Sequence, residues 1–191
     1  MLIESEFEVG APVDKVWAFF QDVPALAPCL PGAEITEVID ADNYKGMVTS
    51  KVGPVKLKFG GTAHIASRDA ASRTIVIQAA GGEAGGKGQA EMNITAVLVS
   101  SGRGTKVKVK QDLVLSGAIA NYGRGMVADI MNVIMKTFAT SVEANIVARE
   151  RGQGPVTGAT SVGGVGVAIS AAKLALKRVV GRLIGKSAWY S

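Results

Sequence analysis

Cysteine and histidine are almost absent from this chain, and aromatic side chains are scarce. Its 191 residues include one cysteine, Cys29, one histidine, His64, and 5% aromatic residues. A single cysteine cannot form an intramolecular disulfide, which agrees with a reducing cytosol. The first nine residues, MLIESEFEV, carry three glutamates and lack the apolar core of a secretory signal. We therefore expect a cytoplasmic protein.

The residue patterns of catalytic and metal sites are also missing. The sequence has no cluster with metal-ligand spacing, no nucleophile elbow and no phosphate-binding loop. Alternation places His64 on the same strand face as Lys56 and Lys58, and we expect this face to be exposed to solvent. The glycine-rich run 81–88 lies between two predicted strands, so it is predicted to be a hairpin connection. No catalytic residue and no metal site are expected, and Cys29 is interpreted as a small buried hydrophobe.

Acidic residues are absent from the last forty positions. Five of the 21 Lys and Arg lie in residues 152–191, so the other sixteen are balanced by the 16 Asp and Glu, and the net charge of +5 belongs to this tail. The neutral body has no basic stripe with interleaved aromatics. Nucleic acid is therefore not expected as a partner.

Residues 167–191 have the pattern of an amphipathic helix with an apolar stripe, a basic opposite side and two aromatics at its end. Such a helix lies in a bilayer interface, where each cation gains about 1 kcal/mol beside anionic headgroups. Spanning is disfavoured, because each cation costs about 2.5–3.5 kcal/mol at the bilayer centre. We expect peripheral attachment to the inner face of the cell membrane. The residues predicted to bind it are Ile169, Lys173, Leu176, Lys177, Arg178, Val180, Arg182, Leu183, Lys186, Trp189 and Tyr190.

Two other roles for this helix remain open. It could pack on the protein's own core, or it could bind an acidic groove on a partner protein. The preceding residues, 152–166, read GQGPVTGATSVGGVG, a composition typical of a flexible linker, which argues against self-packing. The predicted organisation is a ligand-binding domain over 1–151, a linker over 152–166 and a membrane-surface helix over 167–191.

Residues 1–151 contain two segments with the apolar spacing of a helix. They also contain several segments in which apolar and polar residues alternate, as in β-strands. Alternation is clearest in 55–59 and 107–115, where apolar residues alternate with lysines. An α+β fold is expected, in which a curved antiparallel sheet of seven strands wraps around the last helix, because this buries the apolar faces of both. The predicted strands are 2–9, 34–40, 43–52, 54–69, 73–80, 86–100 and 104–116, and the predicted helices are 12–21 and 122–151.

Small apolar residues on the inner face of this sheet would leave room opposite a methionine-rich helix. The small residues are Gly61, Ala63, Ala79, Ala90 and Ala96, and the methionines are Met47, Met92, Met126, Met131 and Met135. An apolar cavity is one interpretation, and methionines that simply fill the core are the other. Its opening is expected between 23–32, the 121–123 turn and the start of the long helix.

Gln111 interrupts a row of inward-facing apolar residues. Its amide is therefore expected to be buried and to need a partner, which could be a ligand carbonyl, a backbone group at a bulge or a water. The residues predicted to bind a ligand are Trp17, Phe59, Met92, Gln111, Met131, Ile134 and Phe138.

Several segments resemble the CoxG family, the G subunits of carbon monoxide dehydrogenase. They include GAPVDKVW at 10–17, PCLPGAE at 28–34, KVGPV at 51–55 and SGAIA at 116–120, and the resemblance spans residues 1 to about 147. The opening segment is shared across the START and Bet v 1-like superfamily. The resemblance implies a helix-grip fold with a hydrophobic cavity. It also implies a non-catalytic, membrane-associated accessory to the aerobic molybdenum-containing carbon monoxide dehydrogenase or a related hydroxylase.

These features together predict a non-catalytic carrier that shuttles a respiratory quinone, such as menaquinone, between the membrane and that enzyme and recruits the enzyme to the membrane. The prenyl quinone would be bound without a covalent bond, and no other cofactor is expected. Two alternatives remain. One is a cyclase or aromatase acting on an aromatic substrate in the same cavity. The other is a ligand-free recruiting or maturation scaffold.

Overall fold

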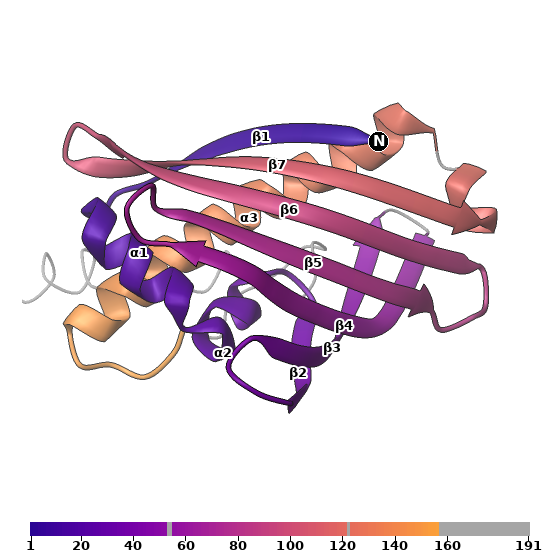
Figure 1. The fold of residues 1–191 in the computed structure, drawn as a ribbon, viewed down its shortest axis with the longest axis horizontal. Coiled ribbons are helices and arrows are strands. Elements are labelled where there is room, and N and C mark those ends of the chain that lie inside the picture. Colours follow the sequence, from indigo (N-terminus) through magenta and orange to yellow (C-terminus); the bar gives the residue numbers. More distant parts are fainter. Residues whose placement is uncertain (53–54, 122, 157–191) are drawn as a thin grey trace, which may run out of the picture. The chain divides into compact units, whose positions relative to one another are not determined.

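The computed structural model describes residues 1–52, 55–121 and 123–156, with side chains left undescribed at 51–55 (Figure 1). Seven strands and three α-helices follow one another with two short 3-10 turns, η1 and η2. Their order is β1 (Leu2–Val9), α1 (Val13–Gln21), α2 (Val23–Leu26), η1 (Ala27–Cys29), β2 (Ala33–Val38), β3 (Asn43–Val52), β4 (Val55–Asp69), β5 (Thr74–Glu83), β6 (Gly88–Ser101), β7 (Gly104–Gly117), η2 (Ala118–Asn121) and α3 (Arg124–Glu150).

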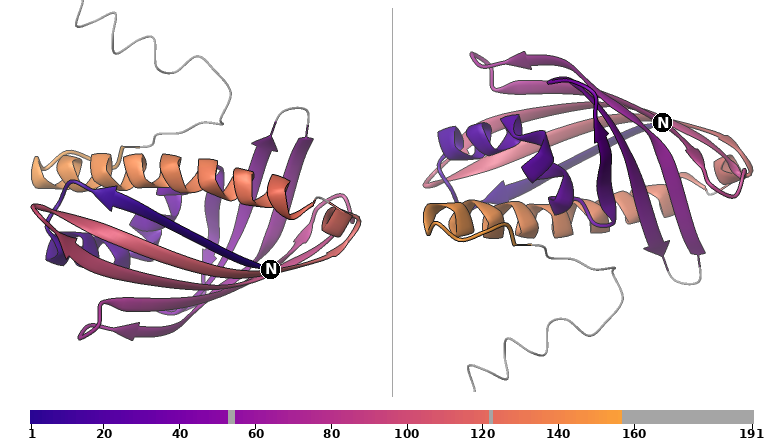
Figure 2. Two further views of the ribbon diagram at one scale, coloured as in Figure 1. Left: turned by 90° about the horizontal axis from the view of Figure 1, so that it is seen from above. Right: turned by 90° about the horizontal axis from the view of Figure 1, so that it is seen from below.

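The strands form one antiparallel sheet in the order β1-β7-β6-β5-β4-β3-β2. The sheet is curved, and α3 runs along its inner face while α1 and α2 cover one end (Figures 1 and 2). This is the predicted α+β helix-grip arrangement. Because β1 pairs with β7, the first and last described strands lie side by side, and β1 contacts α3.

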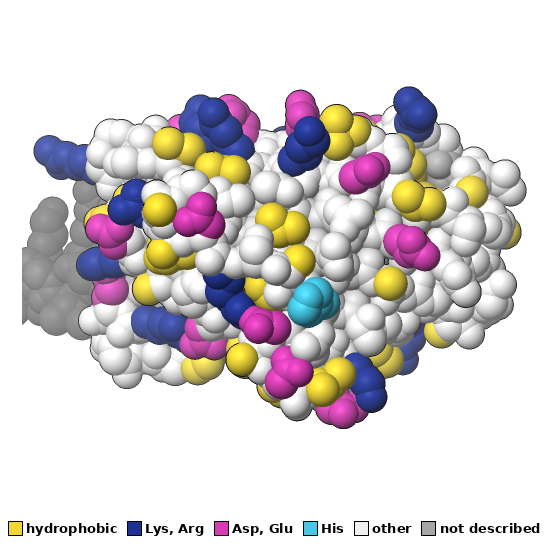
Figure 3. All heavy atoms as spheres, in the orientation of Figure 1, with side chains coloured by type: hydrophobic (Ala, Val, Ile, Leu, Met, Phe, Trp, Pro, Cys, Tyr) yellow, Lys and Arg dark blue, Asp and Glu magenta, His cyan; other side chains and the backbone are white. Residues whose placement is uncertain are grey.

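Strict alternation along β7 separates the inside of the sheet from its outside. Val107, Val109 and Leu113 are buried, whereas Lys108 and Lys110 are exposed, because successive side chains of a strand point to opposite faces. Charged residues of both signs are scattered over the outer face (Figure 3). The registered cross-strand pairs between β1 and β7 there are Glu4 with Lys110, Glu6 with Lys108 and Glu8 with Lys106.

The main core lies where α1 and the C-terminal half of α3 meet the sheet. Val16, Phe19 and Phe20 are buried on α1, and Val142 and Ile146 are buried on α3. Spacings of three and four residues place each set on one helix face. Phe138 of α3 packs edge-to-face on two rings, with centroids 5.8 Å from Phe7 and 6.1 Å from Phe20. This core closes one end of the space between sheet and helix.

The glycine-rich run is only partly a turn, which corrects the prediction for 81–88. Gly81 and Gly82 belong to β5 and pair with Gly61 and Gly60, and only residues 84–87 connect β5 to β6. The strands approach closely there, since a Cβ on Gly61 would collide with the Ala80 carbonyl oxygen. Glycine is needed at this position for packing between strands, a role that its local sequence does not distinguish from a turn.

After α3 the chain turns back along the helix. The backbone N–H of Gln153 donates to the Ala148 carbonyl at 2.9 Å, and the side chain of Asn145 holds the backbone of Val156. The first residues of the segment that the sequence predicts to be a linker are therefore held on α3. Residues 157–191, including the predicted membrane-surface helix, lie outside the described residues. Among the helices that the structure describes, none is long and apolar enough to cross a membrane.

Candidate ligand-binding cavity

A cavity of about 500 Å³ lies between the inner face of the sheet and the N-terminal half of α3, and it is open to the surface. Its volume falls in the range of about 300–1,000 Å³ that is typical of small-molecule sites. The wall consists mostly of apolar side chains from β2 to β7, α3, α2 and η1. Leu57, Ile77 and Ile94 contribute to it from three successive strands. The predicted apolar cavity is confirmed.

The small residues and the methionines that suggested this cavity all lie on its wall. Ala63 and Ala79 face each other across β4 and β5, and Ala79 is registered with Met92 of β6. Short side chains at successive positions leave the sheet surface hollow under α3. Met131 and Met135 reach towards this hollow from the helix, and their unbranched thioethers can adapt to the shape of a ligand.

Six of the seven residues predicted to bind a ligand lie on the cavity wall: Phe59, Met92, Gln111, Met131, Ile134 and Phe138. Trp17 does not, and the prediction that it lines the cavity is wrong. The helix α1 turns Val16 and Phe20 inwards, and Trp17, about 100° round the helix from Val16, packs half-buried against the main core. Phe20 takes the place on the wall that was expected of Trp17.

Gln111 is buried as predicted, with 2% of its surface exposed. Its Nε2 donates a weak hydrogen bond to the thioether sulfur of Met135 at 3.7 Å. Its Oε1 has no hydrogen-bond partner, and no other buried side-chain polar atom of the described residues on this wall lacks one. A buried amide oxygen without a donor costs about 1–3 kcal/mol, which marks the place where a ligand atom would be stabilised.

Of the other polar residues of the wall, Tyr44 and Arg68 are paired, Lys45, Glu34 and Thr62 are exposed, and Ser50 is half-buried. The Tyr44 hydroxyl donates to the Ala41 carbonyl at 2.6 Å, and the Arg68 guanidinium pairs with Asp42. Lys45 is exposed and pairs with Glu37 at 2.9 Å. Gln111 is therefore the buried side chain of the described wall that still has a polar atom without a hydrogen-bond partner.

Cys29 lies behind the wall of the cavity, next to Leu30, which forms part of it. The Asn145 Nδ2 donates to the Cys29 sulfur at 3.5 Å. The thiol is 1% exposed, and burial raises its pKa to about 11, so it is protonated at physiological pH. The thiolate is the nucleophilic form of cysteine. Cys29 accordingly acts as the predicted small hydrophobe.

Potential metal ligands do not gather in the described part of the chain, where no three His, Cys, Asp or Glu side chains are placed to hold an ion. His64 is exposed on β4, as predicted, and its Nδ1 lies 2.9 Å from the Asn43 side-chain oxygen.

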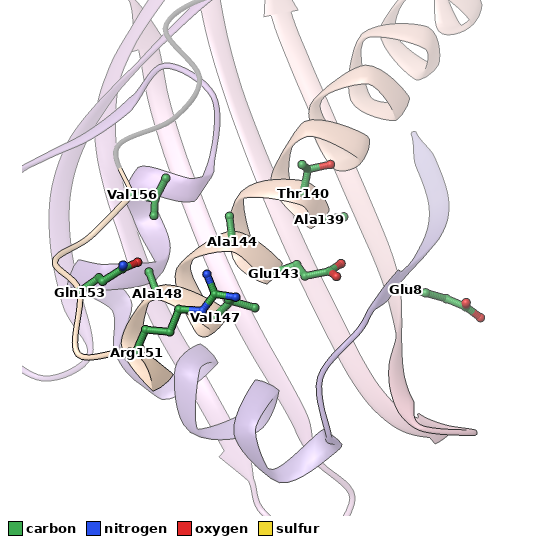
Figure 4. Close-up of a pocket in the computed structure, with 10 residues that line it drawn as sticks. All are labelled: Glu8, Ala139, Thr140, Glu143, Ala144, Val147, Ala148, Arg151, Gln153 and Val156. Atoms are coloured by element: carbon green, nitrogen blue, oxygen red, sulfur yellow. The ribbon is translucent and has the colours of Figure 1, made fainter. Parts of the chain in front are cut away.

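A second recess lies on the outer side of α3, away from the sheet's hollow (Figure 4). Its side chains include Thr140 and Glu143 of α3, Arg151 just after the helix and Glu8 of β1, all of them exposed. Water reaches these charges freely, so the recess offers little apolar burial to a ligand. The inner cavity is therefore the candidate ligand site.

Solved structures with the same fold are similar to this chain. A conserved protein from Geobacillus kaustophilus has a TM-score of 0.69 at 18% identity, over 77% of this chain and 95% of its own. The Zhui aromatase/cyclase from Streptomyces sp. R1128 has a TM-score of 0.57 at 18% identity, over 82% and 99%. A START superfamily protein from Mycobacterium smegmatis has a TM-score of 0.52 at 14% identity, over 78% and 98%. At such low sequence identities, the similarity shows only that the fold is shared.

Among curated protein sequences, none matches this chain. The family model of CoxG, the carbon monoxide dehydrogenase G subunit, matches residues 5–147, which include every strand from β2 to β7, α1 and most of α3. The chain, with its curved sheet, its gripped helix and the hollow between them, belongs to the CoxG family of carbon monoxide dehydrogenase G subunits.

Proposed function

We propose that this protein is a non-catalytic carrier of a respiratory prenyl quinone, such as menaquinone. It would shuttle the quinone between the membrane and an aerobic molybdenum-containing carbon monoxide dehydrogenase, or a related hydroxylase, and recruit that enzyme to the membrane. The observation that carries the proposal is an open apolar cavity of about 500 Å³ whose buried polar recognition rests on one amide.

A quinone suits such a cavity because it combines a flexible hydrocarbon chain with a ring that carries two oxygens. Each CH₂ group of the chain costs about 0.8 kcal/mol in water, so transfer through solvent without a carrier is strongly disfavoured. Met92 and Met131 provide adaptable apolar surface for the chain, and Gln111 provides a polar contact for the ring.

Membership of the CoxG family supports a partner of the carbon monoxide dehydrogenase class. The electrons that such an enzyme removes from its substrate must reach a quinone that is dissolved in lipid. The basic residues of 167–191 would hold the carrier at an anionic membrane surface during this exchange. In this proposal the enzyme carries out the redox chemistry, and this chain transports the quinone.

The direct test is identification of what the full-length protein binds in cells. Protein purified without detergent from a quinone-producing host is analysed by native mass spectrometry and by organic extraction. We expect a prenyl quinone at a substantial fraction of one equivalent, and we expect the purified protein to withdraw quinone from vesicles. Protein that carries no prenyl lipid and withdraws none would overturn the proposal.

A second candidate is a cyclase or aromatase, favoured by the similarity of the fold to the Zhui aromatase/cyclase. Such chemistry needs a proton donor or acceptor within hydrogen-bond reach of the substrate. On the cavity wall Arg68 is occupied by Asp42, the Tyr44 hydroxyl donates to the Ala41 carbonyl, and Lys45 and Glu34 are exposed. The buried Gln111 carries an amide, which does not titrate. Turnover of an aromatic polyketide by the purified protein would establish the enzyme instead.

A further inference from the structure

The orientation of the Gln111 amide is set by its neighbour on α3. Its Nε2 faces the sulfur of Met135 at 3.7 Å. A thioether sulfur carries no hydrogen and can only accept a hydrogen bond. A flipped amide would place Oε1 against that sulfur, where neither atom can donate. The NH₂ group therefore stays towards Met135, and Oε1 is the end of the amide that still needs a partner.

No residue that the structure describes donates a hydrogen bond to Gln111 Oε1, and the buried hydroxyl of Ser5 on β1, registered with Val109, has no hydrogen-bond partner either. On the sheet Gln111 is registered between Ile3 of β1 and Ile94 of β6, and the next inward positions along β7 are Val109 and Leu113. These four residues are apolar, and no titratable side chain is registered beside Gln111. An acceptor in such surroundings forms a hydrogen bond more favourably than it would in water, because there is little competition from solvent.

We propose that Gln111 makes the cavity selective for the reduced, hydroxyl-bearing form of its ligand. This inference rests on the proposed quinone-carrier function. A quinone ring presents two carbonyl oxygens, which only accept hydrogen bonds. Its two-electron, two-proton reduction product, the hydroquinone, presents two O–H groups that donate. A hydroquinone can therefore satisfy Gln111 Oε1, whereas a quinone leaves it without a partner.

Met135 controls how the ligand reaches this oxygen. Both Gln111 and Met135 lie on the cavity wall, and Oε1 is covered in the absence of ligand. Methionine has an unbranched side chain with three rotatable bonds, so a small movement opens the space beside the amide. The ring is thereby assigned to the β7 side of the cavity, with the prenyl chain directed along the methionine and alanine surface towards β3 and β4.

Selectivity for the hydroquinone changes the redox chemistry of the bound ligand. One buried hydrogen bond that is made only by the reduced form corresponds to about tenfold tighter binding. For a two-electron couple, a tenfold ratio raises the midpoint potential of the bound ligand by about 30 mV. A quinone held in this cavity would then accept two electrons from the reduced dehydrogenase, together with two protons from water, more readily than the same quinone in lipid.

The test compares three ligands with one ring system. The probes are 2-methyl-3-prenyl-1,4-naphthoquinone, its dithionite-reduced hydroquinone and the hydroquinone dimethyl ether, which is reduced but donates no hydrogen bond. Affinities are measured anaerobically on the full-length protein by tryptophan fluorescence or calorimetry. We expect the hydroquinone to bind about tenfold more tightly than either of the other two. Equal affinities for all three would overturn the inference while leaving a quinone carrier intact.

Two variants assign the selectivity to one side chain. Gln111→Met has a similar length and no amide, and we expect it to bring the three affinities within about twofold of one another. Gln78→Met makes the same change at an exposed position of β5 and should keep the tenfold ratio. A ratio that survives Gln111→Met would overturn the inference. If none of the three probes binds wild-type protein, the proposed function itself fails. The comparison of hydroquinone with dimethyl ether in the wild type needs no variant.

Discussion

Asn145 and Val156 exchange two hydrogen bonds across the turn that follows α3. The Asn145 Nδ2 donates to the Val156 carbonyl at 3.1 Å, and the Val156 N–H donates to Asn145 Oδ1 at 3.0 Å. The same Nδ2 group also approaches the Cys29 sulfur at 3.5 Å. One side chain thus ties the last described residues to the C-terminal end of α3 and to η1, whose neighbour Leu30 lies on the cavity wall.

We predict that Asn145→Ala releases this segment and lowers the free energy of unfolding by about 1–3 kcal/mol, because the two partly buried hydrogen bonds between Asn145 and Val156 are lost. Chemical denaturation measures the loss of stability. Amide hydrogen exchange should show faster exchange at Val156, while the amides of β7 stay protected. Asn132→Ala, at an exposed position of the same helix, serves as the control and should leave both measurements unchanged. If amide exchange at Val156 is unaltered in Asn145→Ala, Asn145 does not hold this segment on α3.

Cys29 should be inert towards thiol reagents in the native protein. Burial raises the pKa of its thiol to about 11, so at pH 8 almost none is present as the reactive thiolate, and the side chain is 1% exposed. We expect negligible labelling by iodoacetamide at pH 8 and complete labelling in denaturant, followed by mass spectrometry. Because the folded-state pKa is raised, the thiol favours the fold at neutral pH, and this contribution declines as the pH rises from about 8.5 towards 11. Rapid native labelling would contradict the assignment.

The pair formed by Asp22 and Arg149 should contribute stability that depends on pH. The hydrogen bond from Arg149 is the main cause that lowers the pKa of the Asp22 carboxyl. The contribution is therefore present above about pH 4, the ordinary range of an aspartate, and is lost as the pH falls through the lowered pKa. Both side chains are more than 40% exposed, at 42% and 48%, so screening limits the effect. At pH 7 we expect at most about 1 kcal/mol.

Asp22→Asn tests this pair because it keeps the oxygen that accepts from the Ala25 backbone N–H and removes the charge. Urea denaturation of both proteins between pH 7 and pH 2.5 should show a stability difference at pH 7 that shrinks as the solution becomes acidic. Asp69, whose pKa is lowered mainly by the Ser72 hydroxyl, is present in both proteins and cancels in the comparison. A difference that is independent of pH would mean that the charge has no role.

Filling the cavity should abolish ligand uptake without unfolding the protein. Ala79→Phe places a ring where the wall is hollow, between Ala63 and Met92 in the sheet register. We expect quinone binding to weaken by more than tenfold, and the free energy of unfolding to change by less than about 1.5 kcal/mol because the ring occupies empty space. Gln78→Phe, on the exposed side of the same strand, should bind quinone normally. Normal binding by Ala79→Phe would place the ligand elsewhere.

Membrane attachment should depend on the tail's cations. A chain that ends at Val156 keeps the hydrogen bonds between Asn145 and Val156 and loses the predicted surface helix. A full-length Lys173→Glu, Lys177→Glu and Arg178→Glu variant keeps the length and reverses three charges. With about 1 kcal/mol for each cation near an anionic surface, we expect both proteins to lose at least 100-fold in affinity for phosphatidylserine vesicles in sedimentation assays. Unchanged sedimentation of the charge variant would point to a different attachment.

Alternation and helical spacing predicted most of the fold, because a residue's face follows from its position once a strand or helix is recognised. Val107, Val109 and Leu113 therefore fell inside as expected, and so did Gln111. The cavity could be predicted from residue size, since alanines and glycines share the inner face. Side-chain direction is harder to predict. Trp17 was among the residues predicted to bind a ligand, but the rotation of α1 places Phe20 on the wall instead.

Contacts between distant segments left weaker signals in the sequence. Gly81 and Gly82 resembled a turn, because a need for close strand approach has no local signature. Asn145 belonged to the inner stripe of the long helix, and a buried amide there signals a polar partner, but nothing in the sequence identified Val156 as that partner. The missing partner of Gln111 Oε1 likewise became visible only when its neighbours were in place.

The registered pairs of glutamate and lysine on β1 and β7 bear on how the molecule behaves at high concentration. β1 and β2 end the sheet, and an open sheet end with unpaired backbone groups can recruit a second copy into a continuous ribbon. Glutamates at alternate positions of β1, and Glu34 and Glu37 beside a bulge on β2, would bring like charges together in such a ribbon. Repulsion between these charges therefore opposes edge-to-edge association of two copies of the sheet.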